Sequence, residues 1–447
     1  PPLMVTPLSS SASVPPLFVP SGQASADSSF DRAFAADPIG TVLEGYREHG
    51  SIFRINHHGR ERFAMAGVKA NAFIWGDNEL WDYPTSNRHF REQFSDRYLN
   101  QLEGPAYVKK RRRVAAGFKP SVIMKHTAEM GEALHQFVAS LGDEWVPLRL
   151  ACMRIIIAMT SRALMQVDLP PGMDTRMAIH NKHMLKAESL GPWRHLFYLR
   201  PDRLYRRKVI FDYLGGIIDR RQREGAEKED ILSLCLAAHP AGEPPIPRYE
   251  LVHDLSQLMM AGSTTTSHTI LWNLLMTAAQ PEWREEIMQE LSHWTTDGFT
   301  NMGDWPKLKA ACMEIERLRP PSMLFHRLSK KAFEFDGYAV PAGSWVTHLH
   351  TVGHFLEDCY DEPLAFRPWR FLDNPDQPRR DVHGLFGGGA HVCAGVPLAR
   401  VLMPVGVGNL LAYYDIEFQQ TPSLETRLDV VLAPRDEIMV RFKRKRE

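Results

Sequence analysis

Apolar residues recur three and four positions apart along much of the chain, which is the period of a helix with one buried face. The pattern predicts helices at 38–49, 103–118, 121–141, 147–166, 203–223, 228–237, 249–279, 281–295 and 305–318. Shorter runs predict strands at Ile52–Ile55, Arg62–Ala66, Phe333–Phe335, Tyr338–Val340, Val346–Leu349, Ile416–Gln419 and Ile438–Phe442. The expected fold is mainly α with a small β portion, an α+β class.

One predicted helix contains the longest stretch without Asp, Glu, Lys or Arg, from Leu255 to Pro281. The stretch is long enough to span a bilayer. Its centre, Gly262–Ser267, is made of small polar residues, which disfavours insertion into lipid. A helix buried inside a large domain is therefore favoured, and no membrane span is expected in this chain.

The N-terminal residues differ in composition from the rest. Residues 1–29 are rich in Ser, Pro and Ala, carry Asp27 as their one charge, and lack the basic start and apolar run of a secretory signal. We expect 1–29 to be a flexible leader. Residues 30–447 are expected to form a single domain.

Charge and cysteine content narrow the class of protein. The chain has 53 basic and 53 acidic residues, whereas a nucleic-acid binder normally carries a basic excess. The 5 cysteines are widely spread and include no Cys-x-x-Cys pair, which argues against a disulfide framework or a cysteine zinc site. A reducing compartment, the cytoplasm, is expected.

The first segment with clear chemistry is glycine-rich and runs from Phe386 to Gly395, just before a helical run. It is not a phosphate-binding P-loop, because no Lys-Ser/Thr pair follows the glycines. Cys393 within it could be a small buried hydrophobe, as many free cysteines are. A thiol in a glycine turn at a helix N-terminus is, however, suited to form a thiolate that binds a metal.

This segment resembles the haem-binding signature of the cytochrome P450 family, F-x-x-G-x-x-x-C-x-G, which Phe386, Gly389, Cys393 and Gly395 match in full. The resemblance implies the P450 fold and haem b, with Cys393 as the axial thiolate on the iron. It also implies that Phe386 packs beside the sulfur and that His391 bonds a haem propionate. The alternative for His391 is an exposed loop histidine.

Two further motifs match the family's pattern. Glu314 and Arg317, three residues apart, resemble its Glu-x-x-Arg, which pairs with the arginine of a Pro-x-Arg-Phe element, here Arg370. A surface ion pair, which contributes only about 0–1 kcal/mol, is the alternative. Tyr107 and Arg111 on one predicted helix, and Arg327 entering a strand, occupy propionate-binding positions of the family.

The uncharged helix carries a sequence, Ala261–Thr266, that resembles the oxygen-binding motif of the same family. The hydroxyl of Thr265 could bond the carbonyl of Ala261 one turn back and open a groove in the helix. Thr264 stands where the family usually has Asp or Glu, so Thr265 is expected to handle oxygen, with protons from water or substrate. Close helix packing by small residues is the alternative.

The resemblance implies a haem-thiolate monooxygenase that oxidises an apolar small molecule, in specialised metabolism. Electrons would come from NAD(P)H through a ferredoxin or flavodoxin. Non-hydroxylating oxidation, such as dehydrogenation, coupling or rearrangement, is the main alternative, because the usual acid is missing. A non-catalytic haem sensor and a glycine-loop dehydrogenase are weaker alternatives.

A basic run, Lys109–Arg113, points to the electron donor. If Arg111 faces a propionate, the other four side chains spread over the remaining helix faces. We expect Lys110 and Arg113 to help form a positive surface that steers an acidic donor protein. A merely solvated helix face is the alternative.

Overall fold

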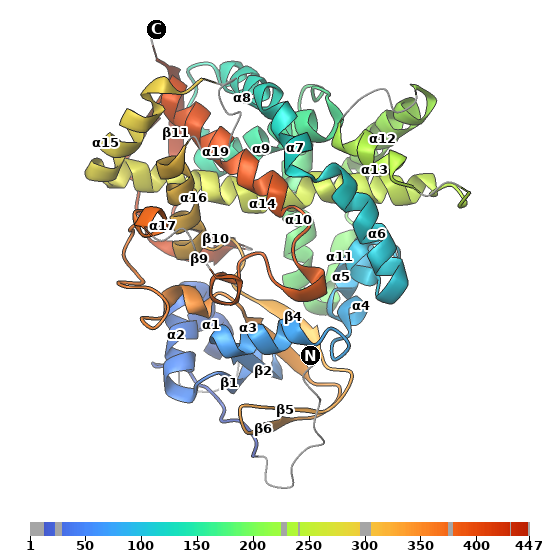
Figure 1. The fold of residues 1–447 in the computed structure, drawn as a ribbon, viewed down its shortest axis with the longest axis vertical. Coiled ribbons are helices and arrows are strands. Elements are labelled where there is room, and N and C mark those ends of the chain that lie inside the picture. The colour runs from blue at the N-terminus through green and yellow to red at the C-terminus, as the bar shows by residue number, and fades with distance from the viewer. Residues whose placement is uncertain are drawn as a thin grey trace. The chain divides into compact units, whose positions relative to one another are not determined.

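The computed structural model describes residues 13–22, 29–224, 230–239, 242–295, 305–373, 379–429 and 431–445 (Figure 1). The chain forms two compact units, each assembled from separate segments. The first, called the sheet unit, comprises Pro1–Arg88, Glu314–Cys393 and Glu425–Ala433. The second, called the helical unit, comprises His89–Met313, Ala394–Leu424 and Pro434–Glu447.

Most long helices belong to the helical unit. Its elements are α5 (Arg88–Gln93), η1 (Leu99–Gln101), α6 (Gly104–Gly117), α7 (Pro120–Ile123), η2 (Met124–His126), α8 (Thr127–Leu141), α9 (Leu148–Met165), α10 (Met173–Ser189), η3 (Gly191–Trp193), α11 (Arg194–Tyr198), α12 (Pro201–Glu224), α13 (Ile231–Ala237), α14 (Arg248–Ala279), α15 (Pro281–Glu290), η4 (Leu291–His293), α19 (Val396–Tyr413) and the first part of α16 (Pro306–Leu318), which belongs to the sheet unit from Glu314 on. A small antiparallel sheet joins β3 (Val146–Pro147), β11 (Met439–Arg444) and β8 (Tyr414–Phe418) in that order.

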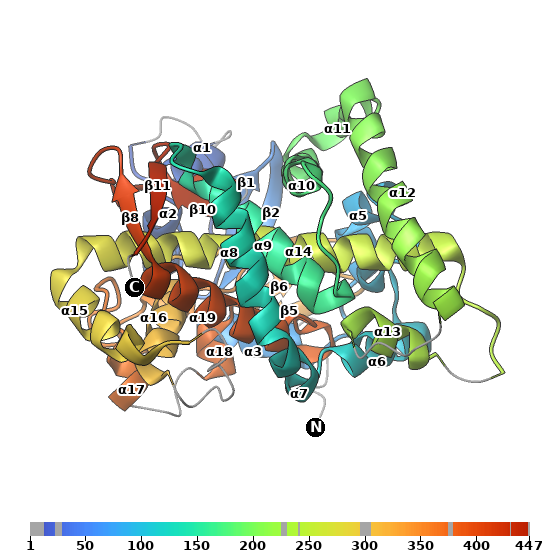
Figure 2. The same cartoon turned by 90° about the horizontal axis from the view of Figure 1, so that it is seen from above.

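Helix α14 is the central element of the helical unit. It packs along α9 and also contacts α12 and α19 (Figure 2). Its C-terminal half is buried, including Ile270 and Trp272 at 0% exposure, so the expectation of a buried helix is confirmed. The helix ends at Ala279 because Pro281, the first residue of α15, cannot continue the hydrogen-bonding pattern.

Within the described part of the chain, one helix is long and apolar enough to cross a membrane. This helix is α19, and 67% of its apolar window is buried inside the protein.

The sheet unit contains the shorter helices and most strands. Its elements are α1 (Ser29–Ala36), α2 (Pro38–His49), β1 (Ile52–His57), β2 (Arg60–Ala66), α3 (Gly67–Gly76), α4 (Tyr83–Ser86), β4 (Phe325–Leu328), β5 (Phe333–Phe335), β6 (Tyr338–Val340), β7 (Trp345–Leu349), η6 (Val352–Phe355), α17 (Arg370–Asp373), α18 (Arg380–His383), η7 (Gly389–His391), β9 (Thr426–Asp429) and β10 (Val431–Pro434). The main sheet has the order β1-β2-β7-β4. Strands β2 and β7 are parallel, whereas the other two pairs are antiparallel.

The first two strands form a tight hairpin. His57 pairs with Arg60, so the turn consists of His58 and Gly59. Both turn residues have positive φ angles, 53° and 67°, as a type I′ turn requires. The hairpin also holds part of the N-terminal segment, since Leu17 bridges Arg54 and Phe18 is buried in the core of the unit. The rest of the expected leader, 1–12 and 23–28, lies outside the described residues.

The predicted α+β class is confirmed, and the strongly periodic segments form helices near the expected bounds. Three helices of eight or more residues were not predicted, namely α1, α3 and α10. Helix α3 is apolar on most sides, and α10 mixes polar and apolar residues without a clear stripe, so neither shows a helical period in its sequence.

Candidate active site

The glycine-rich loop packs tightly against α3. A side chain at Gly388 would come within 2.4 Å of the Trp75 ring, so only glycine allows this approach. Gly389 adopts a positive φ of 64°, which begins the turn η7. The backbone N–H of Cys393 then donates to the carbonyl of Phe386, with 2.9 Å between N and O. The loop is thus a fixed backbone frame that ends at a cysteine.

Cys393 differs from the other cysteines in exposure. Cys152, Cys235 and Cys312 are buried and Cys359 is half-buried, whereas Cys393 is exposed. Burial raises the pKa of the Cys235 thiol to about 11 and also raises the pKa values of Cys152 and Cys359. Among the five thiols, the one in the glycine loop is therefore suited to bind a metal from outside the chain.

Two predicted haem-binding side chains meet on a tyrosine that sequence analysis missed. The His391 ring stacks on Tyr83, with 3.6 Å between ring centroids. The guanidinium of Arg327 lies over the same tyrosine, 4.7 Å from the ring centroid. Tyr83 comes from α4, more than 200 positions before Arg327 and His391 in the sequence. No local sequence pattern therefore indicates this group.

Arg327 lacks an acidic partner among the described residues. Its Nη1 donates to the carbonyl of His326 (2.9 Å), while its buried Nε has no hydrogen-bond acceptor. Burial lowers the pKa of this guanidinium, although the Tyr83 hydroxyl opposes the shift. A cation with a buried, unsatisfied N–H is suited to receive an anion such as a carboxylate.

On α14, Ala261 and Thr265 form an exposed stripe in an otherwise buried stretch. The Thr265 hydroxyl donates to the carbonyl of Ala261 over 3.2 Å, the bond that the spacing predicts. Such a bond to the carbonyl one turn back bends helices and loosens the backbone pattern.

Thr264 faces a different environment. It is buried, and its hydroxyl accepts from Nδ2 of Asn181 on α10 at 2.6 Å. The same Nδ2 lies 2.7 Å from the Ser263 hydroxyl and 2.9 Å from the carbonyl of Met260. Asn181, which sequence analysis missed, therefore anchors the stretch of α14 just before Thr265. Its neighbour His180 is neutral at physiological pH, because burial and nearby arginines lower its pKa to about 3.

Helix α6 carries Tyr107, which is buried, and Arg111, which is half-buried. The expectation that Lys110 and Arg113 face solvent is wrong. Lys110 is 5% exposed and pairs with Asp254 of α14 at 2.6 Å. Arg113 pairs with the same carboxylate at 2.6 Å.

Lys110 and Arg113 point inward because two carboxylates of the facing helix α14, Glu250 and Asp254, lie next to them. Glu250 also contacts Lys110, at 3.3 Å, so two carboxylates draw the two cations inward. In the basic run only Lys109 and Arg112 are exposed, and Lys109 forms an ion pair with Glu243.

The predicted pair of Glu314 and Arg317 is fully buried, which rules out the surface alternative. Arg317 donates twice to the Glu314 carboxylate, at 2.8 Å each. Its other N–H groups reach the carbonyls of His354 (2.7 Å), Pro363 (2.5 Å) and Ala365 (3.2 Å). Arg370 approaches the same carboxylate at 3.3 Å, so the expected three-way cluster is present.

An apolar cluster lies beside Asn181 in the helical unit. Phe94, Tyr98, Met184 and Met260 are buried together, with Phe90 and Phe211 packed against them. Met260 also accepts the Asn181 hydrogen bond through its carbonyl. The cluster therefore adjoins the exposed stripe at its Ala261 end.

The predicted site residues thus form two groups. In the sheet unit the structure joins Phe386, Gly389, His391 and Cys393 in one loop and connects His391 to Arg327 through Tyr83. In the helical unit Ala261, Thr264 and Thr265 share α14, while Tyr107 and Arg111 share α6.

Comparison with known proteins identifies the family. The family model for Cytochrome P450 matches residues 46–442, and the chain belongs to this family. It is 24% identical to lanosterol 14-alpha demethylase of Homo sapiens over 408 residues, which cover 86% of this chain and 78% of that protein. It is 29% identical to geraniol 8-hydroxylase of Catharanthus roseus over 238 residues, which cover 51% of this chain and 46% of that protein.

A solved structure titled retinoic acid bound cyanobacterial CYP120A1 shares the fold, with a TM-score of 0.81 and 22% identity over 97% of this chain and 100% of that one. The protein is thus a P450 oxidoreductase of a family of monooxygenases. Its cofactor is haem held by a cysteine thiolate, and its electrons arrive through redox partners.

Proposed function

We propose that Cys393 is the thiolate that holds haem b, and that the protein uses it to oxidise an apolar small molecule with dioxygen. The exposure of this one thiol in a rigid glycine frame is the observation that supports the assignment. When bound, the haem supplies oxygen activation, driven by electrons from NAD(P)H through the partner. Phe386 would pack beside the sulfur, and Gly389 would leave room for the flat macrocycle.

Four side chains are proposed to hold the haem propionates: Arg327, His391, Arg111 and Tyr107. The unsatisfied buried N–H of Arg327 supports its role, because a propionate would supply the missing acceptor. His391 is oriented by its stacking on Tyr83. Residues 30–447 are proposed to act as one catalytic domain in the cytoplasm.

The substrate is proposed to be an apolar small molecule of specialised metabolism. The buried cluster around Phe94 and Met260 supplies aromatic and thioether surface suited to such a ligand. Relatives are named for lanosterol and geraniol, and the similar solved structure for retinoic acid, all hydrocarbon-rich molecules. A screen of terpenoids, sterols, fatty acids and polyketides for shifts of the haem absorption band would identify the class. A response only to polar ligands would contradict the proposal.

Thr265 is proposed to hold oxygen and pass protons on the exposed stripe of α14, with Ala261 opening the helix there. Thr264, held by Asn181, would fix the position of that stripe rather than replace the usual acid. Protons would then arrive through water or through substrate hydroxyls.

The Thr265→Ala variant should consume NAD(P)H at a similar rate but release most of the electrons as hydrogen peroxide. The reason is that it loses the exposed hydroxyl that orients the proton supply, and such groups contribute about 10²–10⁴-fold to rates. Product and hydrogen peroxide are measured per NAD(P)H consumed, with a reconstituted electron donor.

The matched control is Thr269→Ala, which removes a threonine one turn later on the same helix. Its hydroxyl bonds the carbonyl of Thr265 at 3.4 Å, but the side chain is buried. Coupling should stay near the wild-type level in this variant. Equal uncoupling in both variants, or none in Thr265→Ala, would contradict the role of Thr265.

Non-hydroxylating oxidation is the second candidate function. It is favoured by Thr264 at the position of the usual acid, because dehydrogenation or coupling needs no insertion of oxygen into the product. Product analysis with ¹⁸O₂ separates the two, since hydroxylation places the label in the product. A haem sensor would give no product in either case.

The electron donor is proposed to be an acidic ferredoxin or flavodoxin that docks near α6. Charge reversal of Lys109 and Arg112, the exposed cations of that helix, should slow reduction by the donor at low salt. The defect should shrink as salt rises, because the Debye length falls to about 8 Å at physiological ionic strength. Stopped-flow reduction under carbon monoxide measures this rate.

The control reverses Lys330 and Lys331, two exposed lysines in the sheet unit, and thus makes the same change in net charge. It should leave the rate of reduction unchanged. Slowing by both pairs would show a general charge effect, and slowing by neither would place the docking site elsewhere.

A further inference from the structure

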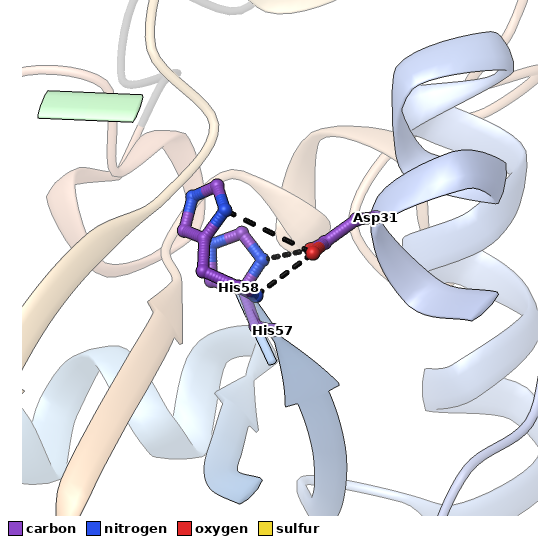
Figure 3. A group of neighbouring side chains, drawn as sticks. All are labelled: Asp31, His57 and His58. Carbon is purple, nitrogen blue, oxygen red and sulfur yellow. Dashed lines mark hydrogen bonds and ion pairs between the residues drawn. The ribbon is translucent and has the colours of Figure 1, made fainter. Parts of the chain in front are cut away.

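Two histidines and an aspartate gather where the β1–β2 hairpin meets α1 (Figure 3). The nitrogen atoms of His57 and His58 and a carboxylate oxygen of Asp31 all lie within 4.8 Å of one another. The His57 side chain is 7% exposed, Asp31 is 25% exposed and His58 is 46% exposed. The cluster is therefore anchored on one side and open to solvent on the other.

The β1–β2 hairpin directs the rings of His57 and His58 toward the carboxylate of Asp31. His58 adopts a left-handed conformation, with φ of 53°, which directs its backbone N–H to Oδ2 of Asp31 at 2.8 Å. Nδ1 of His57 forms a short contact with Oδ1 of the same carboxylate. The His57 ring is held from another side by an edge contact with Phe30, at 5.7 Å between centroids. Two of the three donors are thus preorganised by the fold.

A third imidazole lies next to the cluster. The ring of His326 on β4 lies 5.2 Å from that of His57. His326 is not among the residues whose ligand atoms lie within 4.8 Å of one another, so it stands beside the cluster rather than in it.

We propose that Asp31, His57 and His58 bind a divalent transition-metal ion, with Zn²⁺ as the best fit. Two imidazoles and one carboxylate are a frequent zinc donor set, with bonds of about 2.0–2.2 Å, and zinc adapts to the geometry offered. Imidazole disfavours Mg²⁺ and Ca²⁺, which prefer oxygen ligands. The exposed side, at His58, leaves room for a water ligand. The bound ion would join α1 to the β1–β2 hairpin.

The haem reaction does not use this site, since neither α1 nor the hairpin carries a proposed haem or oxygen ligand. A histidine, rather than the more usual Asn or Gly, occupies the first position of the type I′ turn, and its ring centroid lies 4.1 Å from that of His57. The imidazole of His58 in this position completes the set of three metal donors with Asp31 and His57.

Tag-free holoenzyme titrated with ZnCl₂ should bind one zinc ion per chain by equilibrium dialysis and elemental analysis, in the presence of excess Mg²⁺. Saturating zinc should also raise the thermal midpoint, because the ion binds only the folded chain. The His58→Asn variant should keep the turn, since asparagine tolerates left-handed angles. We expect it to lose at least about 100-fold in zinc affinity, because even loss of an outer partner of a ligand costs 10–100-fold.

The Asp31→Asn variant should lose zinc binding to a similar extent. The matched control is His293→Asn, which removes an exposed histidine of η4. The haem spectrum confirms in each case that the variant is folded. Absence of saturable zinc binding, or equal affinity in His58→Asn, Asp31→Asn and wild type, would overturn the proposal and leave the Asp31–His57 contact as a purely structural hydrogen bond.

Discussion

The Glu314→Gln variant is expected to lose about 3–5 kcal/mol of its free energy of unfolding, because removal of one partner leaves a buried charge uncompensated. Arg317 and Arg370 both rely on the Glu314 carboxylate, and the Arg317 side chain is fully buried. Glutamine keeps the size and one acceptor oxygen, so the change isolates the charge. His354 adds no compensating charge, since burial lowers its pKa to about 4.

This cluster also positions the chain that leads to the glycine loop. Arg317 holds the carbonyls of Pro363 and Ala365, and the backbone N–H of Arg367 donates to Glu314 at 2.8 Å. The variant should therefore lose haem more readily on heating, in addition to its lower stability. Denaturant unfolding and haem absorbance, followed together, measure both effects.

The matched control is Asp212→Asn, which breaks an exposed ion pair between Lys208 and Asp212 on α12. This pair is open to solvent, so we expect no measurable change in the unfolding midpoint. A Glu314→Gln protein as stable as the wild type would show that the buried cluster does not specify the fold around the loop.

Local signals explain why parts of the fold were predictable. The periodic helices α2, α9 and α14 and the paired strands β5 and β6 each carry their pattern within a few turns of sequence. The signature around Cys393 and the pair Glu314–Arg317 are likewise short motifs whose spacing limits their geometry. Such features depend on residues that are close together in the sequence, so the sequence alone predicts them.

The remaining features depend on contacts between distant residues. Asn181 meets Thr264 across 83 sequence positions, and its helix has no clear apolar stripe. The basic run by itself predicts a positive surface, because the acids that pair with Lys110 and Arg113 lie about 140 positions further along the chain. Only the folded chain shows which of these charges are neutralised.

The same limit applies to Tyr83, which connects His391 to Arg327. Its sequence surroundings form a single short helix of 4 residues and no recognisable motif. Only the folded structure shows that its ring stacks on His391 and lies under the guanidinium of Arg327.

The Cys393→Ser variant is expected to abolish monooxygenase activity. Serine keeps the shape of the side chain, but its hydroxyl is not a thiolate and cannot donate comparable electron density to haem iron. Neither Cys152 nor Cys235 offers a substitute, because burial raises the pKa of both thiols, that of Cys235 to about 11. The loop itself should remain intact, since the backbone bond from residue 393 to Phe386 does not involve the side chain.

The most direct test of the central claim is the absorption spectrum of the dithionite-reduced protein under carbon monoxide, for wild type and Cys393→Ser. The wild type should show the red-shifted Soret band of thiolate-bound haem, and Cys393→Ser should show the unshifted band or no haem. A Cys235→Ser control should keep the red-shifted band. A red-shifted band that persists in Cys393→Ser would contradict the assignment of Cys393 as the haem ligand.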